Sequence, residues 1–142
     1  MIQRIQSVWL LLAGIAGLMT YQLPLWSGTL ADKTVRNFTG AESLLLFALI
    51  ILTCILAFVT IFLYKNRKNQ KNFALLGLLL SIGIIALEYF KVEEYKKGLL
   101  NIVSGSWKFG ALMPILMVIF FFLAYQGIRN DEKMIKSLDR LR

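Results

Sequence analysis

The chain has 142 residues, of which 58% are hydrophobic and 17% charged, with a mean hydropathy of +0.67 and a formal net charge of +8. This composition is more apolar than a soluble domain of that length needs, and it favours an integral membrane protein. Histidine is absent and Cys54 is the one cysteine, which excludes histidine metal sites, a histidine general base and an internal disulfide.

Residues 8–26 form the first apolar run, preceded by a short segment with one basic residue, Arg4. We interpret this run as a retained membrane helix and not as a cleaved signal peptide, because its far end has no small-x-small cleavage motif. Trp9 is expected near one membrane interface. Pro24 is expected to mark the end of the helix, because proline lacks a backbone donor and disfavours helix at the residue before it.

Residues 28–40 are polar and are predicted to form a loop, although the alternation in residues 34–38 permits a short strand. Residues 43–64 then form a long apolar run without a charged residue. At about 1.5 Å per residue, a helix of this length crosses a hydrocarbon core of about 30 Å. The second run is therefore predicted to be a membrane span.

A short basic segment, residues 65–72, divides the chain into two halves of similar layout. It contains no acidic residue and four basic ones: Lys65, Arg67, Lys68 and Lys71. The third apolar run, residues 73–90, follows, and its helix is predicted to continue past the membrane surface to Gly98, a natural C-terminal stop. Residues 99–107 are broken by a Ser-Gly-Ser sequence, so we predict a loop lying against the outer surface in place of a fifth span.

Residues 109–128 form the fourth run, and Pro114 is compatible with a helix that begins within a residue or two of it. The tail, residues 129–142, is charged but carries an apolar stripe at helical spacing. This amphipathic tail is predicted to continue the last helix or to lie on the membrane surface. The stripe consists of Met134, Ile135, Leu138 and Leu141.

Lysine and arginine are distributed unequally between the two sides that four spans define. Ten lie on the side of the termini and the basic segment, and six lie on the other side. By the positive-inside rule, both termini and the basic segment are cytoplasmic. The bases flank apolar runs, which favours the lipid bilayer over nucleic acid as a partner. We therefore predict an all-α fold, a four-helix transmembrane bundle forming a single membrane domain over residues 1–142.

Both ends of the chain resemble a known family. Residues 1–6 read Met-Ile-Gln-Arg-Ile-Gln, residues 128–133 read Ile-Arg-Asn-Asp-Glu-Lys, and residues 137–142 read Ser-Leu-Asp-Arg-Leu-Arg. These motifs are similar to those of the domain of unknown function 4293 family, small four-span inner-membrane proteins of Bacteroidota; Asn130 stands where many members have a basic residue. The resemblance implies a multi-pass protein of the bacterial inner membrane, and it implies no activity, catalytic residue or cofactor.

If both recognisable ends lie on the cytoplasmic side, we expect them to meet there. Arg4 would then lie near Asp131, Glu132 or Asp139, and the alternative is that the two ends are separate solvated segments. The residues that we single out for interaction or topology are Arg4, Lys65, Arg67, Lys68, Lys71, Glu88, Asp131, Glu132, Asp139 and Arg140.

Glu88 is the one acidic residue within an apolar run. An intramembrane carboxylate suggests coupling to protons or cations, but Glu88 lies near the end of its run, three residues before Lys91. We therefore favour an interfacial ion pair over a transport site. Cys54 is interpreted as a small packing residue. Small residues four apart are expected to let helices pack closely within the bundle or, alternatively, against another subunit; the pairs are Ala13 with Gly17, Thr53 with Ala57, and Gly77 with Ser81.

The sequence contains no recognisable catalytic, cofactor or metal-binding set, so we do not predict an enzyme. Our first hypothesis is a non-catalytic accessory or assembly subunit of a larger membrane complex, packed on other subunits or on a second copy. The alternative is a small oligomeric transporter or channel, for which the spans offer few polar residues: Thr53, Thr60, Ser81 and Glu88. An enzyme acting on a lipid fits less well, because Glu93 and Glu94 on an exposed segment are a poor acid/base pair.

Overall fold

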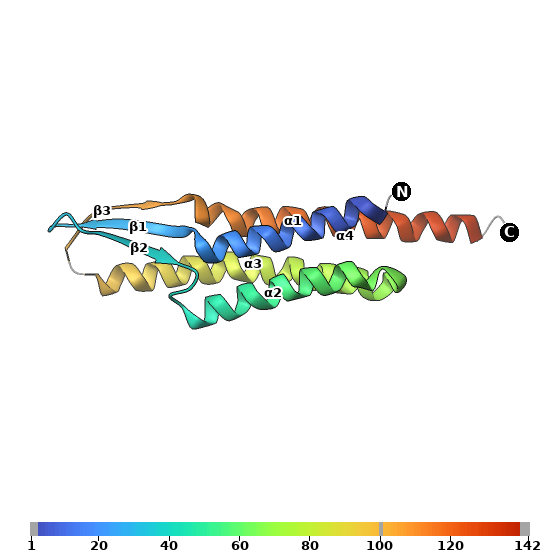
Figure 1. Ribbon diagram of the computed structural model, residues 1–142, viewed down its shortest axis with the longest axis horizontal. Coiled ribbons are helices and arrows are strands. Elements are labelled where there is room, and N and C mark those ends of the chain that lie inside the picture. The colour runs from blue at the N-terminus through green and yellow to red at the C-terminus, as the bar shows by residue number, and fades with distance from the viewer. Residues whose placement is uncertain (1–2, 100, 140–142) are drawn as a thin grey trace.

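The computed structural model describes residues 3–99 and 101–139, without the side chains of residues 3, 4, 136, 138 and 139. The long helices lie side by side, with a small sheet at one end of them (Figure 1). The helices are α1 (Gln3–Gln22), α2 (Leu44–Phe62), α3 (Arg67–Gly98) and α4 (Met113–Asp139). Two short 3-10 helices, η1 (Leu63–Lys65) and η2 (Phe109–Leu112), precede α3 and α4, and the strands are β1 (Pro24–Leu30), β2 (Val35–Thr39) and β3 (Ile102–Trp107).

The four helices form a bundle, and each is long and apolar enough to cross a membrane, as the sequence predicts. Helix α1 packs against α2 and α4, and α3 packs against the same two helices. Buried positions recur along each helix at alternating spacings of three and four; in α4 they are 114, 117, 121, 124, 128 and 131. This spacing places one stripe of side chains toward the neighbouring helices.

Small residues let these helices approach closely, as the sequence predicts. A Cβ atom added to Gly77 of α3 would overlap the ring of Phe121 in α4, and one added to Gly17 of α1 would meet the Sγ atom of Cys54 in α2. Cys54 is buried, and its Sγ lies 3.6 Å from the carbonyl oxygen of Gly14. These small residues therefore make their contacts within the bundle, and Cys54 packs between α1 and α2.

The prediction of an all-α fold is wrong, because three strands form a sheet at one end of the bundle. The strand order is β2-β1-β3, and β1 is antiparallel to both neighbours. Residues 28–40, predicted to form a loop, lie mostly in the β1–β2 hairpin, so the strand that residues 34–38 permitted is present. Residues 99–107, predicted to form a surface loop, contain β3. β3 pairs with β1 over a long sequence separation, which local patterns do not reveal.

The first apolar run divides between a helix and a strand. Helix α1 ends at Gln22, since Pro24 lacks a backbone donor, and the chain then runs as β1. The predicted span of residues 8–26 therefore runs four residues past the end of the helix, and α1 also begins five residues before it, at Gln3. At the far end of β1 the chain turns through Lys33, whose φ is 63°. The Asp32 carboxylate stabilises this turn by accepting bonds from the backbone N–H and the hydroxyl of Thr34, at 3.2 and 2.8 Å.

Trp26 of β1 contacts the C-terminal part of α3 and so holds the sheet against that helix. Its indole lies on Gly28 and Gly105, which are paired across β1 and β3, and a Cβ atom at either position would overlap the ring. Glycine is therefore required at both positions by the close approach of the indole. From α3, Tyr95 meets the indole edge-on at a centroid distance of 6.1 Å, and Lys96 Nζ lies 5.7 Å from the ring centroid. Aromatic and cation–π contacts of this kind hold the sheet in place.

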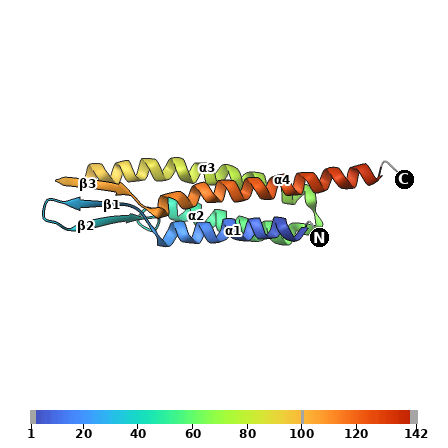
Figure 2. The same ribbon diagram turned by 90° about the horizontal axis from the view of Figure 1, so that it is seen from above.

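Helices α3 and α4 extend the bundle at opposite ends (Figure 2). Helix α3 continues to Gly98, as predicted, and its last turns lie beside the strands. We call this end of the bundle the sheet end. Helix α4 continues through the tail to Asp139, the first of the two predicted alternatives. The start of α1 and the α2–α3 turn lie at the same end of the bundle as this tail (Figures 1 and 2). We call it the basic end. Asn66 caps α3, its side chain accepting from Asn69 N at 3.3 Å, so most of the basic segment is helical.

Candidate functional site

At the basic end, the carboxylate of Asp131 connects three helices. Asp131 lies on the buried stripe of α4 and is 7% exposed. Gln6 of α1 donates from Nε2 to Asp131 Oδ2 at 2.6 Å, and Arg67 Nη1 at the start of α3 lies 3.7 Å from the same oxygen. The two recognisable ends of the chain therefore meet. We predicted Arg4 near Asp131, Glu132 or Asp139, but the side chains of Arg4 and Asp139 lie outside the described part of the structure, so this contact stays a prediction.

Two further contacts complete the basic end. Lys71 Nζ pairs with Glu132 Oε2 at 2.6 Å, which joins α3 to α4 a second time. Gln70 is buried and donates from Nε2 to the carbonyl oxygen of Thr60 at 3.2 Å, satisfying an acceptor near the C-terminal end of α2. Lys65 and Lys68 are exposed, and Arg140 lies outside the described residues.

The basic end is a packed polar joint with little room for a ligand. The space between Gln6, Arg67 and Asp131 is about 10 Å³, the least that one water molecule needs. A buried carboxylate is costly unless it is paired and hydrogen-bonded, and here an amide and a guanidinium perform that role. We interpret this joint as structural.

Glu88 lies on the buried stripe of α3, near the sheet end. It is 3% exposed, and its Oε1 has no hydrogen-bond partner among the residues that the structure describes. The expected interfacial ion pair is not formed, because Lys91 pairs with Glu94 at 2.6 Å. Val92, and not Lys91, follows Glu88 on the buried face. That prediction is therefore wrong, and Glu88 is an acid directed into the bundle.

The hydroxyl groups inside the bundle are satisfied within their own helices. Thr53, Thr60 and Ser81 each donate to the carbonyl oxygen four residues earlier, at 2.8, 2.6 and 2.7 Å. Such local bonds need no polar neighbour on another helix. Of the four polar residues that the sequence offered for a transport path, Glu88 alone retains an unpartnered buried oxygen in the described part of the chain.

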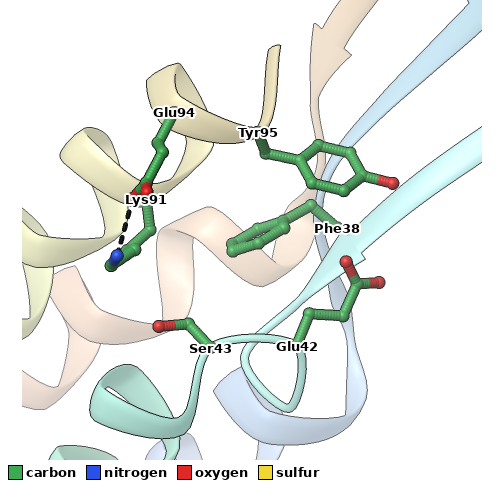
Figure 3. A pocket seen from close by; sticks show the side chains of 6 residues that line it. All are labelled: Phe38, Glu42, Ser43, Lys91, Glu94 and Tyr95. Carbon is green, nitrogen blue, oxygen red and sulfur yellow. Dashed lines mark hydrogen bonds and ion pairs between the residues drawn. The ribbon is translucent and has the colours of Figure 1, made fainter. Parts of the chain in front are cut away.

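A pocket of about 270 Å³ opens at the sheet end, between α3 and the segment that leads from β2 into α2. Its lining, shown in Figure 3, consists of Phe38 from β2, Glu42 and Ser43 from that segment, and Lys91, Glu94 and Tyr95 from α3. The rings of Phe38 and Tyr95 pack with their centroids 5.0 Å apart. Ser43 is the N-cap of α2, and its Oγ accepts from Leu46 N at 3.5 Å.

The two carboxyl groups of the pocket have different electrostatic surroundings. Partial burial raises the pKa of Glu42, against smaller opposing effects of a backbone hydrogen bond and of the charge on Arg36. The hydrogen bond and the charge of Lys91 lower the pKa of Glu94. Burial also raises the pKa of Tyr95, and the negative charge of Glu42 adds to that effect. The pocket thus places one ammonium and two carboxyl groups beside two aromatic rings.

Sequence reasoning missed Gln6, Gln70 and the pocket. Gln6 and Gln70 carried a signal, because each shares the three-four spacing of the buried residues that follow it on its helix, such as Leu10 and Ala74. The pocket carried no such signal, since its lining depends on where the hairpin returns the chain to the bundle.

Four apolar helices of membrane-spanning length, with polar groups gathered at the two ends, define a multi-pass membrane protein. The chain belongs to the family described as Domain of unknown function (DUF4293), whose sequence model it matches over residues 2–141. The match confirms the resemblance seen at the two ends of the sequence. Neither the comparison with curated proteins nor that with solved structures found a match to this chain.

Proposed function

We propose that the protein is a non-catalytic accessory or assembly subunit of the bacterial inner membrane, with its basic end in the cytoplasm. The four spans pack beside helices of other membrane subunits, and the sheet docks on an extramembrane segment of one of them. The distribution of ten bases against six supports this orientation. The resemblance described above supports the inner membrane as the location.

The observation that carries the proposal is the exposed edge strand β3. In the described sheet β3 has a neighbour on one side, and its side chains from Val103 to Trp107 are exposed. Edge strands pair readily with another chain, because the N–H and C=O groups on their free side are unpaired. Trp26 and α3 hold the sheet in place, so a partner strand would dock without a large ordering cost.

Gentle detergent extraction of the tagged protein from its native membrane, followed by mass spectrometry, tests the proposal. We expect a defined membrane protein to co-purify at a fixed ratio. Val103→Lys places a charge on the exposed edge strand β3 and should release that partner. Val35→Lys makes the same change at an exposed position of the opposite edge strand, β2, and should leave the partner bound.

Two results would contradict this reading. Recovery of the wild-type protein alone, as a homo-oligomer of discrete size, would exclude an accessory role in a larger complex. Equal retention of the partner by Val103→Lys and the wild type would exclude docking through β3.

Glu88 supports a second candidate function, a small oligomeric transporter or channel. An unpaired carboxyl oxygen in an apolar bundle is costly unless the group takes up a proton or a cation. Vesicles that contain the purified protein, a pH gradient and a pH-sensitive dye test this function. Wild-type protein should dissipate the gradient, Glu88→Gln should not, and Glu93→Gln on the same helix should behave as the wild type. Equal rates with and without protein would rule out proton passage.

A further inference from the structure

The pocket at the sheet end lies where the apolar parts of two helices stop. Ser43 immediately precedes α2, whose residues are all uncharged, and Lys91 follows the last aromatic residues of the apolar part of α3. In a bilayer this level corresponds to the headgroup layer, which lies directly outside the hydrocarbon core. The pocket therefore opens toward lipid headgroups as well as toward water.

Exposed apolar side chains lead from the pocket toward the spans. Leu44, next to Ser43, is 82% exposed, and Phe90, next to Lys91, is 68% exposed. A molecule with a polar group in the pocket can thus lay an apolar part along α2 and α3. This combination of a polar pocket and a flanking apolar surface is complementary to a lipid.

The polar side of the pocket offers charges of both signs. Figure 3 shows the Lys91–Glu94 pair and Glu42 on different sides of the Phe38 ring. With one ammonium group and two carboxylates, the formal charge of the lining is −1. The lining therefore matches a ligand that carries both a cation and an anion, and its excess negative charge favours the cationic part.

We propose that this pocket binds the headgroup of a phosphoethanolamine lipid. The lipid ammonium lies by Glu42 and the half-buried ring of Tyr95, because carboxylates and aromatic rings both attract a cation. The lipid phosphate pairs with Lys91. Binding exchanges the Lys91–Glu94 bond of 2.6 Å for a Lys91–phosphate bond, and the Glu94 side chain, which is 71% exposed, is then solvated by water.

The chemistry of the lining predicts which headgroups are rejected. A primary ammonium donates hydrogen bonds to carboxylates, whereas the trimethylammonium group of a choline lipid has no N–H to donate. A choline lipid therefore loses the charge-assisted hydrogen bonds and keeps only the weaker attraction of the carboxylate and the Tyr95 ring for its cation. Phosphatidylglycerol has the phosphate but no cation in its headgroup, so the negatively charged lining disfavours it.

Lipid titration of the purified full chain in detergent micelles tests the proposal. Short-chain phosphatidylethanolamine, phosphatidylcholine and phosphatidylglycerol are added separately, and the midpoint of thermal unfolding reports binding, because a ligand of the folded state raises it. We expect a saturable rise with phosphatidylethanolamine. The apparent Kd values of the other two lipids should be at least about tenfold higher.

Two substitutions examine the lining. Glu42→Gln and Lys91→Gln should each raise the apparent Kd for phosphatidylethanolamine by about tenfold, because each removes one charge-assisted contact. Lys97→Gln is the matched control, since Lys97 is exposed on the same helix and outside the pocket. It should bind the lipid as the wild type does.

Equal affinity for the three lipids would overturn the proposal, as would unchanged binding by both Glu42→Gln and Lys91→Gln. Soluble O-phosphoethanolamine identifies the source of the headgroup. It lacks the apolar part, so it should compete only at concentrations at least about a hundredfold above those of the lipid. Competition at equal concentration would exclude a lipid as the ligand. This comparison uses the wild-type protein and so remains decisive where a variant fails to fold.

Discussion

Single polar residues on the buried stripes distinguish the two ends of this bundle. Gln6, Gln70 and Asp131 are buried at the basic end, where each forms a hydrogen bond, whereas Glu88 is buried near the sheet end with one oxygen unpartnered in the described structure. Their burial follows from three-four spacing, which the sequence displays. Their partners do not follow, because the contact of Gln6 with Asp131 joins residues 125 positions apart.

Replacement of Asp131 tests the joint at the basic end. Asp131→Ala leaves the buried amide of Gln6 without its acceptor, so we expect a loss of about 1–3 kcal/mol in the free energy of unfolding. Asp131→Asn keeps an acceptor oxygen and should lose less. Thermal unfolding in one detergent measures both. Asn130→Ala changes an exposed neighbour and should leave the midpoint unchanged; a midpoint for Asp131→Ala equal to that control would contradict a structural role.

The pocket carboxyl groups predict a pH dependence of phosphoethanolamine binding. Burial raises the pKa of Glu42 and Lys91 lowers that of Glu94, so acidification protonates Glu42 first. Only the ionised carboxylate attracts the lipid ammonium, and the apparent Kd should therefore begin to rise above the ordinary glutamate pKa. Arg36 and Tyr95 are the other groups that interact electrostatically with Glu42.

Lipid titrations from about pH 7 to about pH 4 measure this effect. Glu42→Gln should remove the first loss of affinity, and Glu94→Gln should retain it. A wild-type Kd that stays constant down to the ordinary glutamate pKa would show that Glu42 does not govern binding.

At the scale of elements, the sequence predicted the helices far better than the sheet. Each apolar run is long enough to define a span by itself, and the continuation of α3 to Gly98 followed from that glycine as a C-terminal stop. The strands lacked such evidence. Gly28 and Gly105 weaken the strand pattern, since glycine disfavours strands. The two glycines leave room for the Trp26 ring, which lies over both of them once β1 and β3 have paired.

Substitution of Gly105 tests how the sheet is held. In Gly105→Ala the new methyl group overlaps the Trp26 ring, and we expect a loss of about 1–3 kcal/mol from overpacking together with faster proteolysis of the β1–β2 hairpin. Gly98→Ala is the control, because among the described residues no atom beyond its chain neighbours and its own helix backbone lies within 4 Å of an added Cβ there. Limited proteolysis and tryptophan fluorescence measure the effect. Equal proteolysis rates and equal fluorescence of the two variants would show that the contact between the indole and the glycines does not hold the sheet in place.

At the scale of the whole molecule, the larger share of the basic residues and the sheet lie at opposite ends of the apolar bundle. The basic segment, the start of α1 and the tail gather at one end, and the strands gather at the other (Figures 1 and 2). The pocket of about 270 Å³ lies beside the strands. The hydrophobic pattern alone predicted the number of spans and the side on which each connection lies. It did not predict the pocket, which requires the sheet to return the chain beside α3.

This polarity predicts the topology of the protein in its membrane. The excess of bases at the basic end should retain that end in the cytoplasm. In a Cys54→Ala background, a membrane-impermeant maleimide should label Ser104→Cys, on exposed β3, in intact spheroplasts. It should label Lys68→Cys, at the exposed basic end, only after lysis. The reverse order would place the sheet in the cytoplasm, and labelling of both before lysis would contradict a bundle that crosses the membrane between them.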